Sequence, residues 1–599
     1  MSSSPSSTPP ATAGRALPAA QRAPSAYPAE WNVQFDPAVP LTVSPPPPFD
    51  ATDDGFYRQP YWAERYTGFS QEPKVYPVGL VTHLGAPPLK VALRKDQDLE
   101  VTLRDGIKIF VDVIRPADSP SDAKLPTLVA WSPYGKTTPK SQLTVKRYFT
   151  NLPADRVSGF AVAEGPDPAF WAQHGYAVVH VDHRGVNKSG GNVHWWGSVN
   201  AEDGYDVIEW IAEQSWSNGK VGMSGVSWLG ISQLFVAATR PPHLAAVSPR
   251  AHWYDIYRQQ LIIGGIPACK FLNDIGLAIM GEGSLVESLG KMCTRTPLWT
   301  PYWEDKVAKL RNISIPIYMI AGGQTNASEG FSQIPEGNKW LRYAPDYHLA
   351  DYYSDKSLAN DVRFFDRYLK GTSNGWEVDT PEVLLEVREP GVGTGVAKRR
   401  VAQSWPVADT TYTKLHCDAG SGTMSSVAPS AAGATSYDAL TGKATFTYTF
   451  PSDIEVTGFL KAKLWVEVRG GKDLDLFITT AKLPLAGAPV PLTDTRQRAS
   501  LRELATSVST DYKPVHSFEK NSYLGATEIV PVEVSLRTTA MIFRAGEKIV
   551  LTVGGNAMLG GPGALGGAPA LSAVTNSGTH VIHSGGTYDS YLQIPSLPM

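Results

Sequence analysis

Short apolar runs that alternate with helical patterns are the feature that most constrains the fold of this chain. The runs have the length and composition of strands buried on both faces, and they lie at 127–135, 176–185, 220–225, 244–249 and 315–323. Helical spacing of apolar residues fills the intervals at 200–214, after residue 227, and at 358–369. Strands that alternate with helices in this way predict an α/β fold class with a mainly parallel sheet and right-handed crossovers.

Changes in composition and hydropathy pattern along the 599 residues divide the rest of the chain into segments. Residues 1–95 are expected to form a Pro/Ser-rich tail and an extended arm, because the segment up to Pro48 cannot bury enough surface to fold alone. A hairpin at Asp105-Gly106 opens the α/β domain, which is expected over 96–249 and 312–375. The aromatic and Met-rich segment 250–311 predicts an inserted helical cap, and the short alternating runs of 376–599 predict a β-sandwich domain.

Charge and hydropathy exclude several classes of partner. A net charge of −3 leaves no basic field to neutralise phosphates, so neither nucleic acid nor an anionic membrane is expected to bind. No apolar stretch reaches the roughly 18 to 20 residues of a membrane span, and the N-terminus lacks the apolar core of a secretory signal. A soluble cytoplasmic protein is therefore expected, with assembly into a homo-oligomer left open.

The cysteines give no indication of a metal or redox site. Cys269, Cys293 and Cys417 are odd in number, widely spaced and without a CxxC pair, so neither zinc nor a disulfide framework is expected.

Two other patterns resemble cofactor or metal sites only superficially. Residues 561–566 satisfy GxGxxG, but they contain a proline, lie in the β-rich region and open no helix. Asp182, His183 and His194 lack a recognised ligand spacing. No cofactor and no metal are expected.

Residues 219–230, GKVGMSGVSWLG, carry the strongest indication of chemistry. Ser227 follows a predicted strand and precedes a helix, and an α/β sheet presents functional groups at the carboxyl ends of its strands. Gly225, Ser227 and Gly230 resemble a nucleophile elbow, although the second glycine comes three residues after the serine rather than two. The alternative is an ordinary serine in a glycine-rich turn, and the position after a buried strand favours the nucleophile.

Several longer stretches add a family resemblance. They are PTLVAWSPYGK (126–136), HGYAVVHVDHRGVNKSGG (174–191), AEDGYDVIEWIAEQSWSNGKVGMSGVSWLGISQ (201–233) and HLAAVSP (243–249). In order and spacing they resemble the cocaine-esterase and X-prolyl-dipeptidyl-peptidase (CocE/NonD) family of serine hydrolases, with fungal members nearest. The likeness extends from about Leu99 to the C-terminus and takes in FFDRYLKG (364–371) and GTHVIHSGGTYDSYLQIP (578–595). It implies an α/β-hydrolase domain, an inserted helical cap and a C-terminal jelly-roll domain.

The resemblance also implies roles for single residues. Ser227 matches the nucleophile, while the amide of Trp228 and the hydroxyl of Tyr134 match the two donors to the oxyanion. Family members more often carry tyrosine at the position of Trp228, a change that alters the pocket but keeps the amide. His348 in APDYH (344–348) matches the general base and has the expected place in the chain order nucleophile, acid, histidine.

Other polar residues near the predicted site have simpler interpretations. His174, His183 and His252 are alternative bases, but each is more simply a structural or wall residue. Arg184 is expected to brace the strand-end turn near the nucleophile.

The acid of the predicted triad departs from the family pattern. Family sequences place an aspartate after the strand that here reads IYMIAGGQTN, and the matching residue is Asn326 or Thr325. Asparagine can orient an imidazole but carries no charge, and loss of that charge in a serine enzyme costs roughly 10⁴ in rate. Asp346 or Asp351 of the histidine loop, or Glu329 from the following helix, could replace it, or hydrolysis could be weak.

The leading interpretation is a serine hydrolase that cleaves an ester or amide of a small organic acyl substrate through an acyl-enzyme. Trp253, Tyr254 and Tyr257 of the cap are expected to form an apolar wall of the substrate pocket. The alternative keeps the fold and serves as a lyase, cyclase or acyl transferase in small-molecule (secondary-metabolite) biosynthesis. A non-catalytic ligand-binding protein is third.

Overall fold

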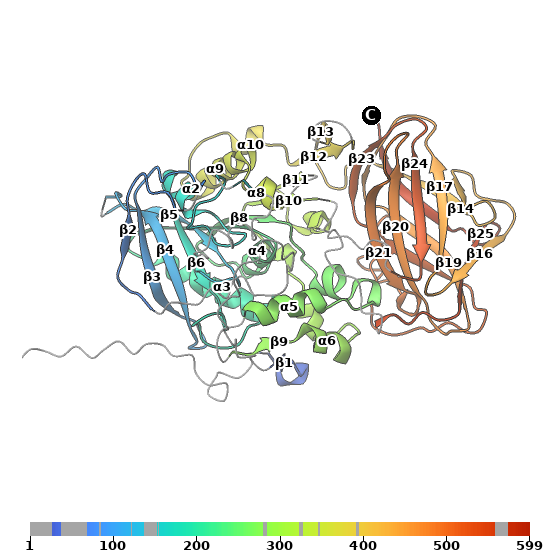
Figure 1. Cartoon of the computed structure of the whole chain (residues 1–599), viewed down its shortest axis with the longest axis horizontal. Coiled ribbons are helices and arrows are strands. Elements are labelled where there is room, and N and C mark those ends of the chain that lie inside the picture. Colours follow the sequence, from blue (N-terminus) through green and yellow to red (C-terminus); the bar gives the residue numbers. More distant parts are fainter. Residues whose placement is uncertain are drawn as a thin grey trace, which may run out of the picture.

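A computed structural model describes residues 27–36, 69–82, 85–120, 122–136, 152–153, 155–279, 284–322, 327–344, 348–390, 395–556 and 573–599. Two main parts lie side by side in Figure 1, an α/β part built on a mixed sheet and a C-terminal β-rich part drawn in orange and red. The helices α5 and α6 lie along the lower edge of the same view.

The central sheet is parallel in its middle and antiparallel at its edges. Its order is β2–β3–β4–β6–β5–β7–β8–β10–β11–β12–β13, and the strands from β6 through β12 run parallel. The strands are β2 (Lys74–Tyr76), β3 (Leu93–Thr102), β4 (Lys108–Pro116), β5 (Leu125–Ala130), β6 (Ala177–Asp182), β7 (Ser217–Val226), β8 (Leu244–Arg250), β10 (Ile317–Ala321), β11 (Lys339–Tyr343), β12 (Val383–Arg388) and β13 (Val396–Ala402). The five apolar runs predicted to be buried strands form β5, β6, β7, β8 and β10.

Strands β3 and β4 form the predicted hairpin. The Leu103 N–H donates to the Ile107 carbonyl at 2.8 Å, and Gly106 between them has φ +83°, a conformation that glycine adopts without steric cost. Strand β3 already begins at Leu93, and β2 pairs with it. Folded structure therefore starts inside the segment that was expected to be an extended arm.

Helices cover both faces of the central sheet. They are α2 (Pro168–Gln173), α3 (Ser198–Ala212), α4 (Trp228–Ala238), α8 (Leu349–Tyr352), α9 (Asp355–Leu369) and α10 (Trp376–Asp379), with the 3₁₀ turn η6 (Ala327–Gln333) after β10. Val129 of β5 shares an apolar cluster with Leu234 of α4, whereas its neighbour Leu128 shares one with Phe365 of α9. Successive strand residues face opposite sides, so each side of the sheet has its own core.

Residues 250–311, here called the cap, contain short helical segments and one short strand. These are η3 (Tyr257–Leu261), η4 (Ile263–Gly265), α5 (Lys270–Ile279), β9 (Val286–Glu287), α6 (Leu289–Arg295), α7 (Pro301–Asp305) and η5 (Leu310–Asn312). No helix in the described ranges is long and apolar enough to cross a membrane.

Part of the N-terminal segment binds to the cap. Strand β1 (Phe35–Asp36), which follows the turn η2 (Ala29–Trp31), pairs antiparallel with β9. Tyr27 is buried, and its hydroxyl donates to a Glu287 carboxylate oxygen at 3.4 Å. This segment belongs to the expected Pro/Ser-rich tail and extended arm, but its aromatic residues bury apolar surface that the Ser/Pro composition alone does not indicate.

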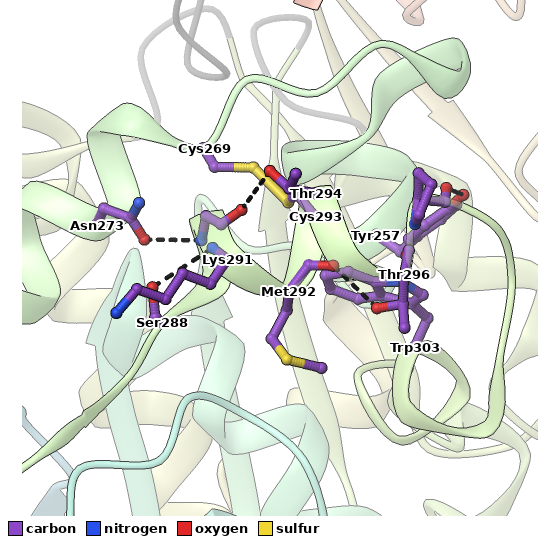
Figure 2. Close-up of a disulfide and its surroundings, with 12 residues drawn as sticks. Tyr257, Cys269, Asn273, Ser288, Lys291, Met292, Cys293, Thr294, Thr296 and Trp303 are labelled. Carbon is purple, nitrogen blue, oxygen red and sulfur yellow. Dashed lines mark hydrogen bonds between the residues drawn. A yellow bond between two sulfur atoms is a disulfide. The ribbon is translucent and has the colours of Figure 1, made fainter. Parts of the chain in front are cut away.

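A disulfide joins Cys269, just before α5, to Cys293 of α6 (Figure 2). The sequence led us to expect no disulfide framework, and this pair was not anticipated. Spacing along the sequence could not indicate it, because the two cysteines meet only through the packing of α5 against α6. Cys417, the third cysteine, is buried and free.

The C-terminal part consists of strands packed around one apolar core. The strands are β14 (Thr411–Asp418), β15 (Thr423–Ser425), β16 (Gly433–Asp438), β17 (Lys443–Thr449), β18 (Ile454–Gly458), β19 (Lys461–Arg469), β20 (Asp475–Leu483), β21 (Val490–Arg498), β22 (Val530–Ser535), β23 (Thr539–Phe543), β24 (Lys548–Gly554), β25 (Thr579–Ser584) and β26 (Tyr591–Leu597), with the turn η7 (Ala499–Leu501). Leu464 of β19 and Ile582 of β25 share the core with Ile478 of β20 and Leu551 of β24. This arrangement agrees with the predicted β-rich region.

One predicted strand joins a different sheet from the one expected. The run VLLEVREP was placed in the C-terminal β-rich region, but it forms β12, which pairs parallel with β11 and extends the central sheet. Arg388 at its end also pairs with Met541 of β23, so β12 links the two parts. Apolar alternation predicts a strand but does not say which sheet the strand joins.

Candidate active site

Ser227 lies in a strained turn between β7 and α4. Its backbone has φ +56° and ψ −118°, a region that non-glycine residues rarely adopt and that is concentrated at functional sites. Its N–H donates to the Arg250 carbonyl at 3.0 Å, and its carbonyl accepts from the Ile231 N–H at 2.8 Å. These bonds hold the turn that the nucleophile-elbow pattern predicts.

Close packing requires both glycines of the elbow. A Cβ at Gly225, where φ is +148°, would lie 2.5 Å from the Leu229 Cβ, and one at Gly230 would lie 2.3 Å from the Arg250 carbonyl oxygen. The unusual spacing thus has a physical reason: Gly230 lets the first turn of α4 approach the end of β8.

Tyr134 is held by the turn that follows β5. The next two residues anchor this turn, because the Lys136 N–H donates to Asp182 at 2.6 Å and its ammonium group donates to Asp112 at 2.8 Å. Gly135 has φ +92°, and a Cβ there would lie 2.9 Å from the Asn187 amide nitrogen. The turn therefore directs the Tyr134 hydroxyl toward Ser227, with which it shares a hydrogen bond.

The backbone amide of Trp228 faces the site, whereas its indole ring packs in the core. The N–H donates toward the carboxyl of Glu164. The indole ring lies 4.3 Å from the Trp196 ring and 4.6 Å from the Trp195 ring, measured between centroids, and it stacks on His183. The tryptophan that replaces the usual family tyrosine therefore packs inward.

Glu164 is a member of the site that the sequence analysis missed. Its carboxyl is buried and receives the Tyr134 hydroxyl as well as the Trp228 N–H. Burial raises the pKa of this carboxyl to about 8, and those two donors oppose the rise. The one signal in the sequence is a pair of acids, Glu164 and Asp167, in the run AVAEGPDP (161–168) before α2, which does not by itself indicate a site.

His348 enters the site from the loop that follows β11. It occupies the N-terminal boundary of α8, and its Nε2 lies 4.0 Å from a carboxyl oxygen of Glu164. Desolvation by the surrounding protein lowers the pKa of His348 to about 4, although 46% of the side chain is exposed and water at that open side opposes the lowering. Among the described residues, no hydrogen bond joins the imidazole directly to the Ser227 hydroxyl, and catalytic contacts are often loose before substrate binds.

The candidate acids lie in different environments. Asn326, Thr325 and Asp346 are outside the described residues. The two carboxylate oxygens of Asp351 bind Arg250 at 2.8 Å and Arg342 at 2.7 Å. Glu329 is buried and pairs with Lys513 of the C-terminal part at 3.3 Å. Asp351 and Glu329 thus have structural partners, and neither is bound to His348 in the described part of the chain.

The three aromatic residues expected to line the substrate pocket have mainly structural contacts. The Tyr257 hydroxyl donates to the Pro297 carbonyl at 2.7 Å, and its ring packs against Trp303. Trp253 is buried in the same core cluster, and Tyr254 is half-buried beside Lys513. A substrate wall at these residues stays a prediction.

The other histidines and Arg184 have interior partners. His183 lies between the rings of Trp131 and Trp228. Arg184 binds Asp203 of α3 and Asp105 of the hairpin, each at 2.6 Å, in agreement with a bracing role.

His252 and His174 are the remaining alternatives to His348 as general base. Burial lowers the pKa of His252 to about 3 and also lowers that of His174. The described residues contain no group of three or more His, Cys, Asp or Glu side chains that could hold a metal ion. Residues 561–566 and their GxGxxG pattern lie outside the described residues.

The fold and the strained serine between β7 and α4 define the class of the α/β-hydrolases. The family model for the X-Pro dipeptidyl-peptidase (S15 family) matches residues 105–282, and the model for the X-Pro dipeptidyl-peptidase C-terminal non-catalytic domain matches residues 374–593. A CocE/NonD family hydrolase from Staphylococcus aureus has 32% identity and a TM-score of 0.81, over 88% of this chain and 97% of that one. The chain belongs to the CocE/NonD family of serine hydrolases.

Curated relatives match shorter segments. A protein of Mycobacterium bovis that is provisionally named a serine esterase is 28% identical over 237 residues, 38% of this chain and 37% of its own length. The cocaine esterase of a Rhodococcus species is 31% identical over 158 residues, 26% of this chain and 24% of its own. The matches thus span 24% to 37% of the length of these two relatives.

Proposed function

We propose that the protein cleaves an ester or amide of a small organic acyl substrate through an acyl-enzyme on Ser227. The observation that carries this proposal is the convergence of the Tyr134 hydroxyl and the Trp228 N–H on one buried point beside Ser227 and His348. Two fixed donors at such a point suit a developing oxyanion. Family membership supports a hydrolase of the esterase or dipeptidyl-peptidase type.

The reaction has two halves. Ser227 Oγ bonds to the acyl carbon while its proton passes to His348, and the carbonyl oxygen becomes an oxyanion held by the Tyr134 hydroxyl and the Trp228 N–H. The bond to the leaving alcohol or amine then breaks, and the leaving group takes the proton from His348. Water repeats the sequence on the acyl-enzyme, releases the acid and restores Ser227.

The acid member of the triad is proposed to be atypical. Asn326 matches the family position, and an amide there would orient the imidazole without supplying a charge. Asp351 supports the site differently, because its carboxylate is bound to Arg250 and Arg342 and can position the segment that carries His348.

Labelling with a fluorophosphonate tests the nucleophile. We expect covalent labelling of the wild-type protein on the peptide that contains Ser227, and none in Ser227→Ala. Ser232→Ala is a matched control, since Ser232 is a buried serine of α4 outside the site, and it should be labelled like wild type. A wild-type protein that stays unlabelled while it performs another reaction would contradict the acyl-enzyme.

A second candidate is a lyase, cyclase or acyl transferase of small-molecule biosynthesis. The observation that favours it is the carboxyl of Glu164 at the point where an oxyanion would lie. It predicts activity that survives Ser227→Ala, whereas a ligand-binding protein would show saturable binding and no turnover. Secondary metabolism, nearness to fungal members and assembly into a homo-oligomer stay predictions.

A further inference from the structure

The Glu164 carboxyl occupies the position that the proposed mechanism reserves for the oxygen of the substrate. The two groups that would hold an oxyanion, the Tyr134 hydroxyl and the Trp228 N–H, both donate toward it. His348 Nε2, which would receive the Ser227 proton, faces the same carboxyl at 4.0 Å. A carboxyl has the shape and the acceptor atoms of the acid that an ester hydrolase releases, so it fits a site built for an acyl oxygen.

Hydrogen bonds to backbone carbonyls connect the Glu164 segment to the Ser227 turn and to the segment that carries His348. Glu164 has φ +62°, a left-handed backbone conformation that non-glycine residues rarely adopt. The Glu164 carbonyl accepts from the Val226 N–H at 3.0 Å, one residue before Ser227. The next carbonyl, that of Gly165, accepts from the Tyr353 hydroxyl at 2.8 Å, five residues after His348. A surface loop that merely passed by would not need such bonds to both catalytic segments.

The side chain is held less completely than its backbone. One carboxyl oxygen, Oε2, is buried without a hydrogen-bond partner. An unsatisfied buried oxygen is unfavourable, so the occupied arrangement can give way when a ligand offers the donors a better acceptor.

We propose that Glu164 is a resident occupant of the oxyanion pocket, which blocks Ser227 in the resting enzyme and is displaced by the carbonyl oxygen of a substrate. The proposal rests on the proposed function, because it takes the Tyr134 and Trp228 donors to be the oxyanion pocket of an acyl-enzyme reaction. Displacement reverses when the acid product leaves, and the Glu164 carboxyl then returns to the same donors.

Ionisation of Glu164 weakens the block. The groups that face its carboxyl are the Tyr134 hydroxyl from the β5 turn, the Trp228 N–H from α4, and His348 and Tyr353 from the histidine segment. With a pKa of about 8 the carboxyl is neutral at lower pH, and it becomes an anion as the pH rises through that value. Because burial holds this pKa above the ordinary value of a glutamate, the pocket favours the neutral carboxyl, and ionisation favours the displaced position in water. Access to Ser227 therefore increases on the alkaline side.

The test compares labelling rates of the full-length wild type, Glu164→Ala, the nearly isosteric Glu164→Gln and the surface control Glu100→Gln. The probe is an uncharged fluorophosphonate, used from about pH 5.5 to about pH 9.5. The wild-type rate should rise as the pH rises toward about 8 and level off above it, whereas both Glu164 variants should lack this rise. If the open arrangement is populated about a tenth of the time, Glu164→Ala should be labelled about tenfold faster than wild type.

The outcomes separate the two proposals. Suppose that wild type and Glu100→Gln are labelled at Ser227 and that the Glu164 variants show the same rate and pH profile. This result would overturn the block and leave the assignment of the nucleophile intact. A wild-type rate that stays level or falls from about pH 5.5 to about pH 8 would overturn it without any variant. Failure of every protein to label at any pH would instead overturn the proposed function. Far-ultraviolet circular dichroism and thermal unfolding of each variant confirm that folded protein is compared.

Discussion

Arg250 connects the nucleophile to the segment that carries the histidine. Its carbonyl accepts the Ser227 N–H at 3.0 Å, and its guanidinium binds Asp351 at 2.8 Å, three residues after His348. The guanidinium is fully buried between Asp351 and Asp361. One residue at the end of β8 thus sets the relative positions of two chain segments that are 121 residues apart, counted from Ser227 to His348.

Asp351→Asn should destabilise the protein and misplace His348. The substitution leaves Arg250 and Arg342 buried with one carboxylate fewer, and loss of one partner of a buried ion pair costs about 3 to 5 kcal/mol. Chemical denaturation gives the free energy of unfolding, and fluorophosphonate labelling gives the state of the site. Asp355→Asn is the control, because that side chain is 86% exposed, and an equal loss in both variants would contradict the role of the buried pairs.

Tyr134→Phe should slow catalysis with little change in substrate binding. The substitution removes one donor to the oxyanion, which typically costs about 10² to 10³ in kcat and leaves KM nearly unchanged. Steady-state kinetics with an activated ester measures both constants. Tyr523→Phe alters an exposed tyrosine of the C-terminal part and should behave as wild type. A rise in KM alone would assign Tyr134 to substrate binding instead.

Activity should persist to a lower pH than is usual for an enzyme whose general base is a histidine. Desolvation lowers the pKa of His348 to about 4, so the imidazole stays neutral, and able to accept the Ser227 proton, down to pH values well under 6.5. The measurement is kcat/KM of the wild type against pH, which reports the essential groups of the free enzyme. An acid limb with a midpoint at or above 6.5 would mean that a nearby carboxylate stabilises the imidazolium.

Removal of the disulfide should loosen the cap. Cys269 and Cys293 are 24 residues apart in sequence, and a crosslink that closes a loop of this size contributes about 3 kcal/mol to the free energy of unfolding. Cys293→Ser should therefore unfold at lower denaturant concentration than the oxidised wild type, and reduced wild type should match the variant. Thiol titration of the denatured protein checks the pairing itself: a single free thiol, from Cys417, is expected, and three would rule out the bond.

The local hydropathy pattern was enough to predict the α/β sheet, because buried parallel strands appear as continuous apolar runs and amphipathic helices as apolar residues at helical spacing. The runs that form β5, β6, β7, β8 and β10 and the turn at Asp105-Gly106 are of this kind. Pattern could not assign β12 to the central sheet or pair Cys269 with Cys293, because both depend on partners distant in sequence.

The sequence by itself indicated Ser227 as the candidate nucleophile, because the end of a predicted strand, two glycines and the start of a helix lie within residues 219–230. Only the tertiary structure decided what surrounds it. Glu164 comes from a loop before α2 and Asp351 from a helix after β11, and their neighbours follow from packing rather than from spacing. Hydropathy encodes which residues are buried, whereas the partner of a buried charge is chosen by the three-dimensional arrangement that brings its counter-charge within contact distance.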